Sequence, residues 1–357
     1  MPYLNVTEVE SAVTSLATAY PDLTQLIALP NESFEGRTAH ALQIGVPAAL
    51  PKPCVMMIGG VHAREWGSCE ILIHLAADLL EAQRDGTGLG YGGTSFTAGQ
   101  VSDLLHRIDL VIYPLVNPDG RHYSQTVRPM WRKNRNPSYT GGSQNPDCVG
   151  VDLNRNYDFL FDFVTAFDPA AGPRVSNDPC DVQVYAGPSA ASEAETQNVL
   201  ALLDQFPQTA WFVDVHSYSQ DILYNWGDDE NQSDNPDMNF RNSDFDGKRG
   251  RPNDLAYAEY IPREDENAEQ ELAEAFCQGL KGVRGLAYKP ITGFHLYPTS
   301  GTSDDYVYSR HFADPDQGKV LGFTVEWGTE FHPRWAEMEQ IIRDVDAGLV
   351  QFCLATT

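Results

Sequence analysis

The segment CVMMIGGVHAREWGSCE, residues 54–70, has the alternation of apolar run, glycines and helix start that is typical of an α/β fold. An apolar run at 55–58 ends at two glycines, and apolar residues return with helical spacing from residue 71. This order predicts a buried strand, a tight turn and the start of a helix. Ligands of open α/β sheets bind beyond the carboxyl ends of the strands. His62 and Glu65 occupy that place, so they are candidate metal ligands; the alternative is a capped helix start with incidental polar residues.

Other apolar runs extend this pattern along the chain. Further buried strands are predicted at residues 108–116, 211–217 and 320–327. Amphipathic helices are predicted at residues 5–20, 266–283 and 335–354. No Gly/Ser-rich linker or change in composition divides the 357 residues. We therefore expect an α/β fold, in which residues 1–357 form a single domain with a mixed, mostly parallel central β-sheet and helices on both faces.

Shorter signals predict where individual elements begin. Thr7 with Glu10, and Ser192 with Glu195, have the spacing of capping boxes at helix starts. The alternation of residues 149–153 is typical of a strand.

The composition limits the partners that the protein can have. The chain carries 24 basic and 50 acidic residues, a formal net charge of −26. Such a chain is not expected to bind nucleic acid or anionic membranes, whereas cationic ligands are favoured; the alternative is that the charge serves only solubility. No run of about eighteen apolar residues predicts a membrane-spanning helix.

Residues 228–264 are acidic, rich in asparagine and without clear periodicity, so we expect a loop insertion there. Asn242, Asp244 and Asp246-Gly247 resemble the start of a calcium-binding loop, but Asn253 stands where the closing glutamate is required. A structural Ca²⁺ ion is therefore a prediction from a partial motif.

Polar residues that are candidates for binding or catalysis occur at several other places in the sequence. Residues 130–136, MWRKNRN, form a basic island in an acidic chain; this favours an anion or oxyanion site over a solvated loop. Asn154 and Arg155 are suited to binding a carboxylate. His216 ends a predicted strand, as His62 does. Glu326 lies in an apolar strand, where a glutamate is expected to be paired or to face a cleft.

Six motifs carry a resemblance to a known family. They are HAREW at 62–66, WRKNR at 131–135, CVGVDLNRNY at 148–157, HSYSQ at 216–220, YPTSGTSDDY at 297–306 and FTVEW at 323–327. Each motif alone is weak, but their number and order make a chance match implausible. Together they resemble the M14 family of zinc metallocarboxypeptidases, of the carboxypeptidase A/B type, over roughly residues 7–352 with 228–264 as an extra segment.

The resemblance implies a zinc enzyme and assigns its central residues. The implied ligands of one zinc ion are His62, Glu65 and His216. Asp152 would lie behind His62 and fix its orientation. Glu326 would be the general base that activates water. Arg132 would polarise the scissile carbonyl and stabilise the oxyanion.

The resemblance also implies an exopeptidase that acts on the C-termini of peptides and proteins. The terminal carboxylate would be held by Asn154, Arg155 and Tyr297. Arg64 and Tyr218 would contact the peptide further from the cut. Asp304 would form the floor of the pocket for the last side chain, which predicts release of C-terminal Lys and Arg because a buried anion favours a cation.

Other functions stay open at this point. A broader pocket would also accept large hydrophobic residues, and a cell-wall or gamma-glutamyl peptide carboxypeptidase would use the same machinery. A deacylase or amidohydrolase would not need Asn154, Arg155 and Tyr297. A non-catalytic binding relative would be expected to lack a ligand or the base, all of which are present.

The resemblance implies a disulfide between Cys148 and Cys180, and hence a secreted protein, which we expect to be a monomer. Cys277 and Cys353 are candidates for a second bridge, and Cys54 and Cys69 are either paired or buried as free thiols.

Overall fold

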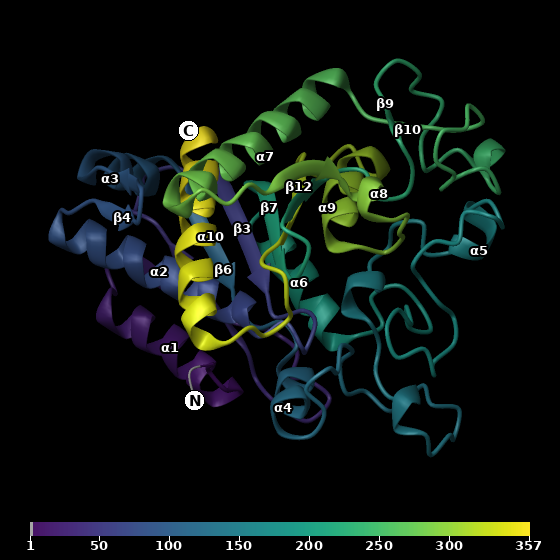
Figure 1. The fold of residues 1–357 in the computed structure, drawn as a ribbon, viewed down its shortest axis with the longest axis horizontal. Coiled ribbons are helices and arrows are strands. Elements are labelled where there is room, and N and C mark those ends of the chain that lie inside the picture. Colours follow the sequence, from purple (N-terminus) through teal and green to yellow (C-terminus); the bar gives the residue numbers. More distant parts are fainter. Residues whose placement is uncertain (1–2) are drawn as a thin grey trace.

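An eight-stranded sheet runs through the computed structural model, which describes residues 3–357 (Figure 1). Its strand order is β1-β2-β6-β3-β7-β12-β8-β11. The bounds are β1 Thr24–Ala28, β2 His40–Ile44, β3 Cys54–Gly59, β6 Asp109–Tyr113, β7 Thr209–His216, β8 Asp221–Tyr224, β11 Lys289–Thr292 and β12 Leu321–Glu326. The central strands β6, β3, β7 and β12 are mutually parallel, and antiparallel pairs occur toward the edges. The predicted mixed, mostly parallel sheet is confirmed.

Helices cover both faces of the sheet (Figure 1). Their bounds are α1 Val6–Ala19, α2 Gly67–Asp85, α3 Ala98–Arg107, α4 Pro118–Thr126, α5 Phe163–Ala166, α6 Ala194–Gln205, α7 Arg263–Arg284, α8 Gly293–Leu296, α9 Ser303–Ala313 and α10 Trp335–Ala355. Strand β3 shows why two helical layers are needed. Val55 and Met57 enter a core shared with α2, α7 and α10, whereas Met56 and Ile58 enter a core shared with α6 and α9. Because successive side chains of a strand point to opposite faces, an entirely apolar strand requires cover on both sides.

Both expected capping boxes are wrong. The cap of helix α1 is Asn5, two residues before Thr7. The Asn5 side chain accepts from Glu8 N (3.0 Å), and the Glu8 carboxylate accepts from Asn5 N (2.8 Å). Helix α6 begins after Glu193 with no side-chain cap. The Ser192 hydroxyl donates to Glu193 instead (2.7 Å), and Glu195 is buried.

The expected strand at 149–153 is also absent from the described chain. Irregular backbone there connects two short 3₁₀ helices, Pro146–Cys148 and Leu153–Arg155. The amide of Val151 donates to the side chain of Asn134 (2.9 Å) and that of Asp152 donates to the Tyr185 carbonyl (2.8 Å). Loops rather than a strand therefore satisfy this backbone.

The acidic segment 228–264 is largely irregular, as expected, with one short parallel pair, β9 Asn231–Gln232 and β10 Glu259–Tyr260. It is less solvated than its composition indicates, because Arg249, Tyr257 and Glu259 are buried. Its backbone bonds to the α5 region, for example from Asp168 N to Arg249 O (2.9 Å).

Candidate metal centre and substrate pocket

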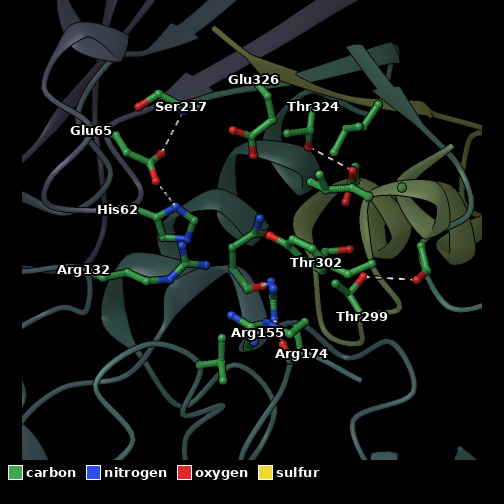
Figure 2. Close-up of a pocket in the computed structure, with 18 of the residues that line it drawn as sticks. His62, Glu65, Arg132, Arg155, Arg174, Ser217, Thr299, Thr302, Thr324 and Glu326 are labelled. Carbon is green, nitrogen blue, oxygen red and sulfur yellow. Dashed lines mark hydrogen bonds and ion pairs between the residues drawn. The ribbon is translucent and has the colours of Figure 1, made fainter. Parts of the chain in front are cut away.

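Three potential metal ligands converge at the carboxyl ends of the neighbouring strands β3 and β7. His62 and Glu65 lie in the turn between β3 and α2, and His216 is the last residue of β7. Nδ1 of His62 lies 2.8 Å from one Glu65 oxygen, and Nδ1 of His216 lies 3.0 Å from the other. The two Nδ1 atoms are 3.0 Å apart. All three side chains are buried, and Figure 2 shows His62 and Glu65 facing one another.

These donors fit a zinc ion. Nε2 of His62 lies 3.1 Å from Asp152, and Nε2 of His216 lies 2.9 Å from Asp214. With the ring protons directed at these carboxylates, both Nδ1 lone pairs and the Glu65 carboxylate converge on one another. A cation stabilises such an arrangement. Two imidazoles and one carboxylate are also a donor set of catalytic zinc sites.

The charges at the centre favour ionised carboxylates. Burial alone raises the pKa of Glu65, but the adjacent His62 and His216 outweigh this effect and lower the pKa below its usual range. The same competition occurs at Asp152, where burial is outweighed by Arg132 and His62, so that its pKa is also lowered.

Asp152 links the metal centre to Arg132. One carboxylate oxygen faces His62, and the other accepts from Arg132 Nε (3.0 Å) and Nη2 (2.9 Å). A paired guanidinium of this kind has few accessible orientations. Arg132 is thereby held beside His62, as Figure 2 shows.

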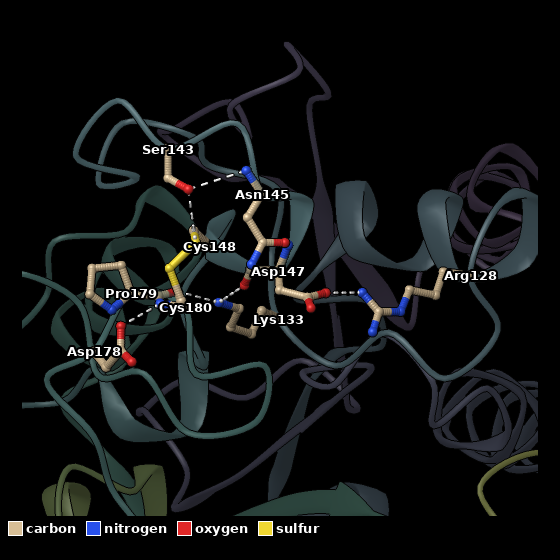
Figure 3. Close-up of a disulfide and its surroundings, with 9 residues drawn as sticks. All are labelled: Arg128, Lys133, Ser143, Asn145, Asp147, Cys148, Asp178, Pro179 and Cys180. Carbon is tan, nitrogen blue, oxygen red and sulfur yellow. Dashed lines mark hydrogen bonds and ion pairs between the residues drawn. A yellow bond between two sulfur atoms is a disulfide. The ribbon is translucent and has the colours of Figure 1, made fainter.

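The interpretation of the basic island at 130–136 as an anion site was only partly correct, because only one of its three cations lies at the site. Arg132 lines the cavity next to the candidate metal ligands. Lys133 is buried and donates to the carbonyls of Asp147 (3.0 Å) and Pro179 (2.9 Å), beside the disulfide in Figure 3. The Arg135 guanidinium lies 3.8 Å from the Tyr123 ring centroid.

Glu326 ends β12 and is paired in register with His216 of β7. It lines the cavity beside the metal ligands (Figure 2). Burial, followed by repulsion from Glu65, raises the pKa of Glu326 to about 8. A bound cation opposes this effect because it stabilises both carboxylates.

A cavity of about 370 Å³ brings most of the predicted site residues together. Its lining includes His62, Arg64, Glu65, Arg132, Asn154, Arg155, Tyr218, Tyr297, Asp304 and Glu326. His216 and Asp152 are buried behind this wall. Arg174 and Phe331 are among the lining residues that sequence reasoning missed. Phe331 lies 4.1 Å from the Arg64 guanidinium and 4.8 Å from the Tyr218 ring.

The predicted carboxylate-binding groups are held by the backbone around them. The Asn154 side-chain oxygen accepts from Ser303 N (2.8 Å), which fixes the orientation of its amide. Arg155 donates from Nε to the Arg174 carbonyl and from Nη1 to the Asn154 carbonyl. These bonds leave Nη2 of Arg155 as the guanidinium nitrogen without a bond in residues 3–357.

Asp304 lies in the first turn of α9. Its Oδ2 accepts from Thr324 Oγ1 (2.9 Å) and its Oδ1 accepts from Asp305 N (3.0 Å). Burial, followed by the charge of Asp304, raises the pKa of Asp305 well above its usual range. Two acids in one buried pocket repel one another, so a cation entering the pocket would be stabilised.

Asp214 is a further buried acid that sequence reasoning missed. It precedes His216 by two residues, and alternate residues of a strand share a face. The spacing Asp-x-His at the end of a predicted strand was therefore a usable signal. Ser303 Oγ donates to its Oδ2 (2.7 Å).

The expected disulfide between Cys148 and Cys180 is present (Figure 3). Cys54, Cys69, Cys277 and Cys353 are free thiols, so the second bridge considered between Cys277 and Cys353 is not formed.

The expected calcium ligands have other partners. The Asn242 side chain accepts from Asp244 N (3.1 Å) and caps a short 3₁₀ helix. Asp246 is paired with Arg249 (2.7 Å). Calcium binding stays a prediction.

The fold and site define a class of α/β protein in which a buried group of candidate metal ligands lies at the carboxyl edge of a parallel sheet. The family model of zinc carboxypeptidases matches residues 9–347. The chain therefore belongs to this zinc carboxypeptidase family, and the family predicted from the sequence is confirmed.

Individual relatives agree with this membership. The chain is 30% identical over 323 residues to carboxypeptidase B of Homo sapiens, which covers 89% of this chain and 61% of that protein. It is 30% identical over 308 residues to carboxypeptidase A2 of Mus musculus, with coverages of 86% and 59%. The chain thus spans about three fifths of these relatives.

A solved structure confirms the fold. The carboxypeptidase A from Helicoverpa armigera superposes with a TM-score of 0.72 at 22% identity, covering 99% of this chain and 74% of that one.

Proposed function

We propose that this chain is a zinc-dependent exopeptidase that hydrolyses the C-terminal peptide bond of peptides and proteins. The proposal rests on one observation: a group of candidate metal ligands, the half-buried Glu326 and Arg132 meet in one cavity, next to a pocket with an acidic floor. Membership of the zinc carboxypeptidase family supports the proposal.

His62, Glu65 and His216 would hold the ion. Zinc supplies a Lewis acid that lowers the pKa of water and polarises a carbonyl. Glu326 takes a proton from the attacking water at its carboxylate and returns it to the leaving amine. Arg132, held by Asp152, stabilises the negative charge that develops on the carbonyl oxygen.

Asn154, Arg155 and Tyr297 would bind the terminal carboxylate, which restricts hydrolysis to the last bond because an internal bond offers no such group. Arg64 and Tyr218 would contact the preceding residues. Phe331 lies against both of these side chains, which supports a shared surface for the peptide.

The pocket is proposed to prefer Lys and Arg. Asp304 and Asp305 line it together, and their mutual repulsion favours a cationic side chain. The net charge of −26 acts in the same direction. A pocket that also accepts large hydrophobic residues is the main alternative.

The test compares hydrolysis of hippuryl-Arg, hippuryl-Lys and hippuryl-Phe, with a chelator and with zinc restored. We expect chelation to abolish activity, zinc to restore it, and both basic substrates to be cut faster than hippuryl-Phe. Equal rates would contradict the basic preference, and full activity with a chelator would contradict the zinc mechanism.

Asp304→Asn isolates the origin of the preference. The kcat/KM for hippuryl-Arg is expected to fall by at least about 30-fold, because a buried charge pair loses one partner, whereas the value for hippuryl-Phe should change little. Asp316→Asn, at an exposed position, is the matched control. If Asp304→Asn leaves the ratio of the two substrates unchanged, Asp304 does not determine specificity.

We also propose that the protein is secreted and monomeric and binds one zinc ion per chain. The disulfide supports an oxidising compartment. Within residues 3–357, helices with the length and apolarity needed to cross a membrane are lacking.

A further inference from the structure

The carboxylate of Asp214 is fully buried directly behind the metal ligand His216. Asp214 has no exposed surface, and its Oδ2 lies 2.9 Å from Nε2 of His216. Its other oxygen, Oδ1, is buried and has no hydrogen-bond partner within the described chain. An ionised carboxylate in such a place is unfavourable unless nearby positive charge compensates it. The His216 ring lies closest to it and would carry positive charge from an ion bound at Nδ1.

Ser303 is the second partner of the Asp214 carboxylate. Its Oγ donates to the same Asp214 oxygen (2.7 Å), and it is fully buried at the start of α9. Its backbone N–H donates to the Asn154 side chain (2.8 Å). The next residue is Asp304 in the pocket floor. One serine therefore contacts the metal centre and the groups proposed to bind the terminal residue.

The arrangement mirrors the one around the other histidine. Asp152 contacts His62 through one oxygen and Arg132 through the other. Asp214 also has two partners, but it contacts both His216 and Ser303 through the same oxygen, Oδ2. Each imidazole thus has its own buried carboxylate, and each carboxylate has a second partner, which is Arg132 in the cavity wall or Ser303 next to Asp304.

We propose that Asp214 is a positioning residue for the metal ligand His216, and that Ser303 orients Asp214. Asp214 fixes the proton of His216 on Nε2, directs Nδ1 at the ion and makes the imidazole a stronger donor. The inference rests on the proposed function only for the identity of the ion as zinc.

The test measures the zinc dissociation constant of the folded protein by competition with a fluorescent chelator. Loss of a carboxylate behind a metal-binding histidine typically weakens metal binding by about 10–100-fold. We expect Asp214→Asn, which keeps an acceptor oxygen, at the lower end of this range and Asp214→Ala at the upper end. Ser303→Ala should weaken zinc binding by less than about tenfold, because Asp214 keeps its contact with His216.

Asp344→Asn is the matched control. Asp344 is also a buried carboxylate with one unpartnered oxygen, but it is bonded to Arg284 (2.6 Å) and lies on α10 away from the cavity. Its removal should lower stability and leave the zinc constant within about twofold of the native value. A native zinc constant in Asp214→Asn and Asp214→Ala, or an equal loss in Asp344→Asn, would overturn the proposal.

Ser303→Ala provides a second answer if the Asp214 variants do not fold. An unchanged zinc constant in Ser303→Ala then contradicts the proposal, and a weakened one supports it. The zinc constant is measured without substrate turnover, so the role of Asp214 is tested separately from the proposed exopeptidase activity. A chain that binds zinc through Asp214 but cleaves no peptide would contradict only the proposed exopeptidase.

Discussion

Glu326 has a position that only a chemical role explains well, because it is an acid at the end of an apolar strand, inside the cavity. Replacing it by Gln keeps the shape and removes the base. We expect kcat to fall by about 10²–10⁴-fold, the usual contribution of a general base, with KM and zinc content close to native. Steady-state kinetics and metal analysis of Glu326→Gln check this.

Glu330→Gln is the control for that variant, since Glu330 is exposed and does not line the cavity. It should retain native kcat. Turnover by Glu326→Gln at the native rate would show that another group accepts the proton.

Glu195 is expected to make folding stability depend on pH. Burial raises its pKa to about 8 from the ordinary value of 4.5, and Glu193 and Asp119 add to this effect. The folded state therefore binds the proton more tightly than the unfolded state, so stability falls as the pH rises from about 4.5 to about 8. Glu195→Gln should be more stable than the native protein by about 1–3 kcal/mol at pH 8 and no more stable at pH 4.5.

Urea unfolding at the two pH values measures this difference. The comparison is Glu32→Gln, at an exposed position on the same surface cavity as Glu195, which should show little pH-dependent change. A gain for Glu195→Gln that is equal at both pH values would contradict the assignment.

Single residues of the site could be predicted from the sequence where a polar residue interrupts or ends an apolar segment. His62, His216 and Glu326 stood out because polar groups at the ends of apolar strands are unusual. Asp214 was missed because its spacing from His216 places both side chains on one face of the strand but does not reveal that the carboxylate contacts the imidazole. Phe331 and Arg174 were missed because apolar and basic residues in loops carry no periodic signal.

Helices α7 and α10 pack closely enough for one glycine to be required between them. A Cβ built on Gly348 of α10 would lie 2.6 Å from the Phe276 ring of α7. Gly348→Ala should therefore reduce the free energy of unfolding by about 1–3 kcal/mol, since the added methyl group overpacks the core. Thermal and denaturant unfolding measure the loss.

Gly90→Ala in β4 (Leu89–Tyr91) is the comparison, because a Cβ at that position meets no atom within 4 Å. Its effect should be within about 0.5 kcal/mol. A stabilising effect of Gly348→Ala would show that the helices can separate without loss.

Elements were predictable when hydrophobic burial alone determines them. The strands β3, β6, β7 and β12 were found because both of their faces are covered. Residues 149–153 were wrongly predicted because distant loops provide their hydrogen bonds. The capping errors have a similar cause: Asn5 competes with Thr7 for the same helix end, and packing buries Glu195.

The whole molecule carries a negative field that should guide its substrates. With a net charge of −26, association with cationic peptides is expected to be accelerated at low salt. We expect kcat/KM for a peptide of net positive charge that ends in Arg, such as Arg-Arg-Ala-Ala-Arg, to fall by about 3–10-fold between about 0.05 and 0.5 M NaCl, because salt screens the attraction. The value for hippuryl-Arg, whose guanidinium and carboxylate leave no net charge, is the internal control, and an equal salt effect on both would contradict steering.

The strand order of the sheet has a consequence for how the protein reaches its native state. Adjacent strands β3, β7 and β12 bring together His62, His216 and Glu326, which are far apart in the sequence. Parallel pairing between distant segments is slow, because the entropy of closing long loops is lost before the stabilising contacts form. The full candidate site, which includes Glu326, is therefore completed late in folding, after residues 54–326 have assembled. A nascent chain lacks this site until its last strand, β12, has been synthesised, so the proposed peptidase activity would be absent during synthesis because of the strand order.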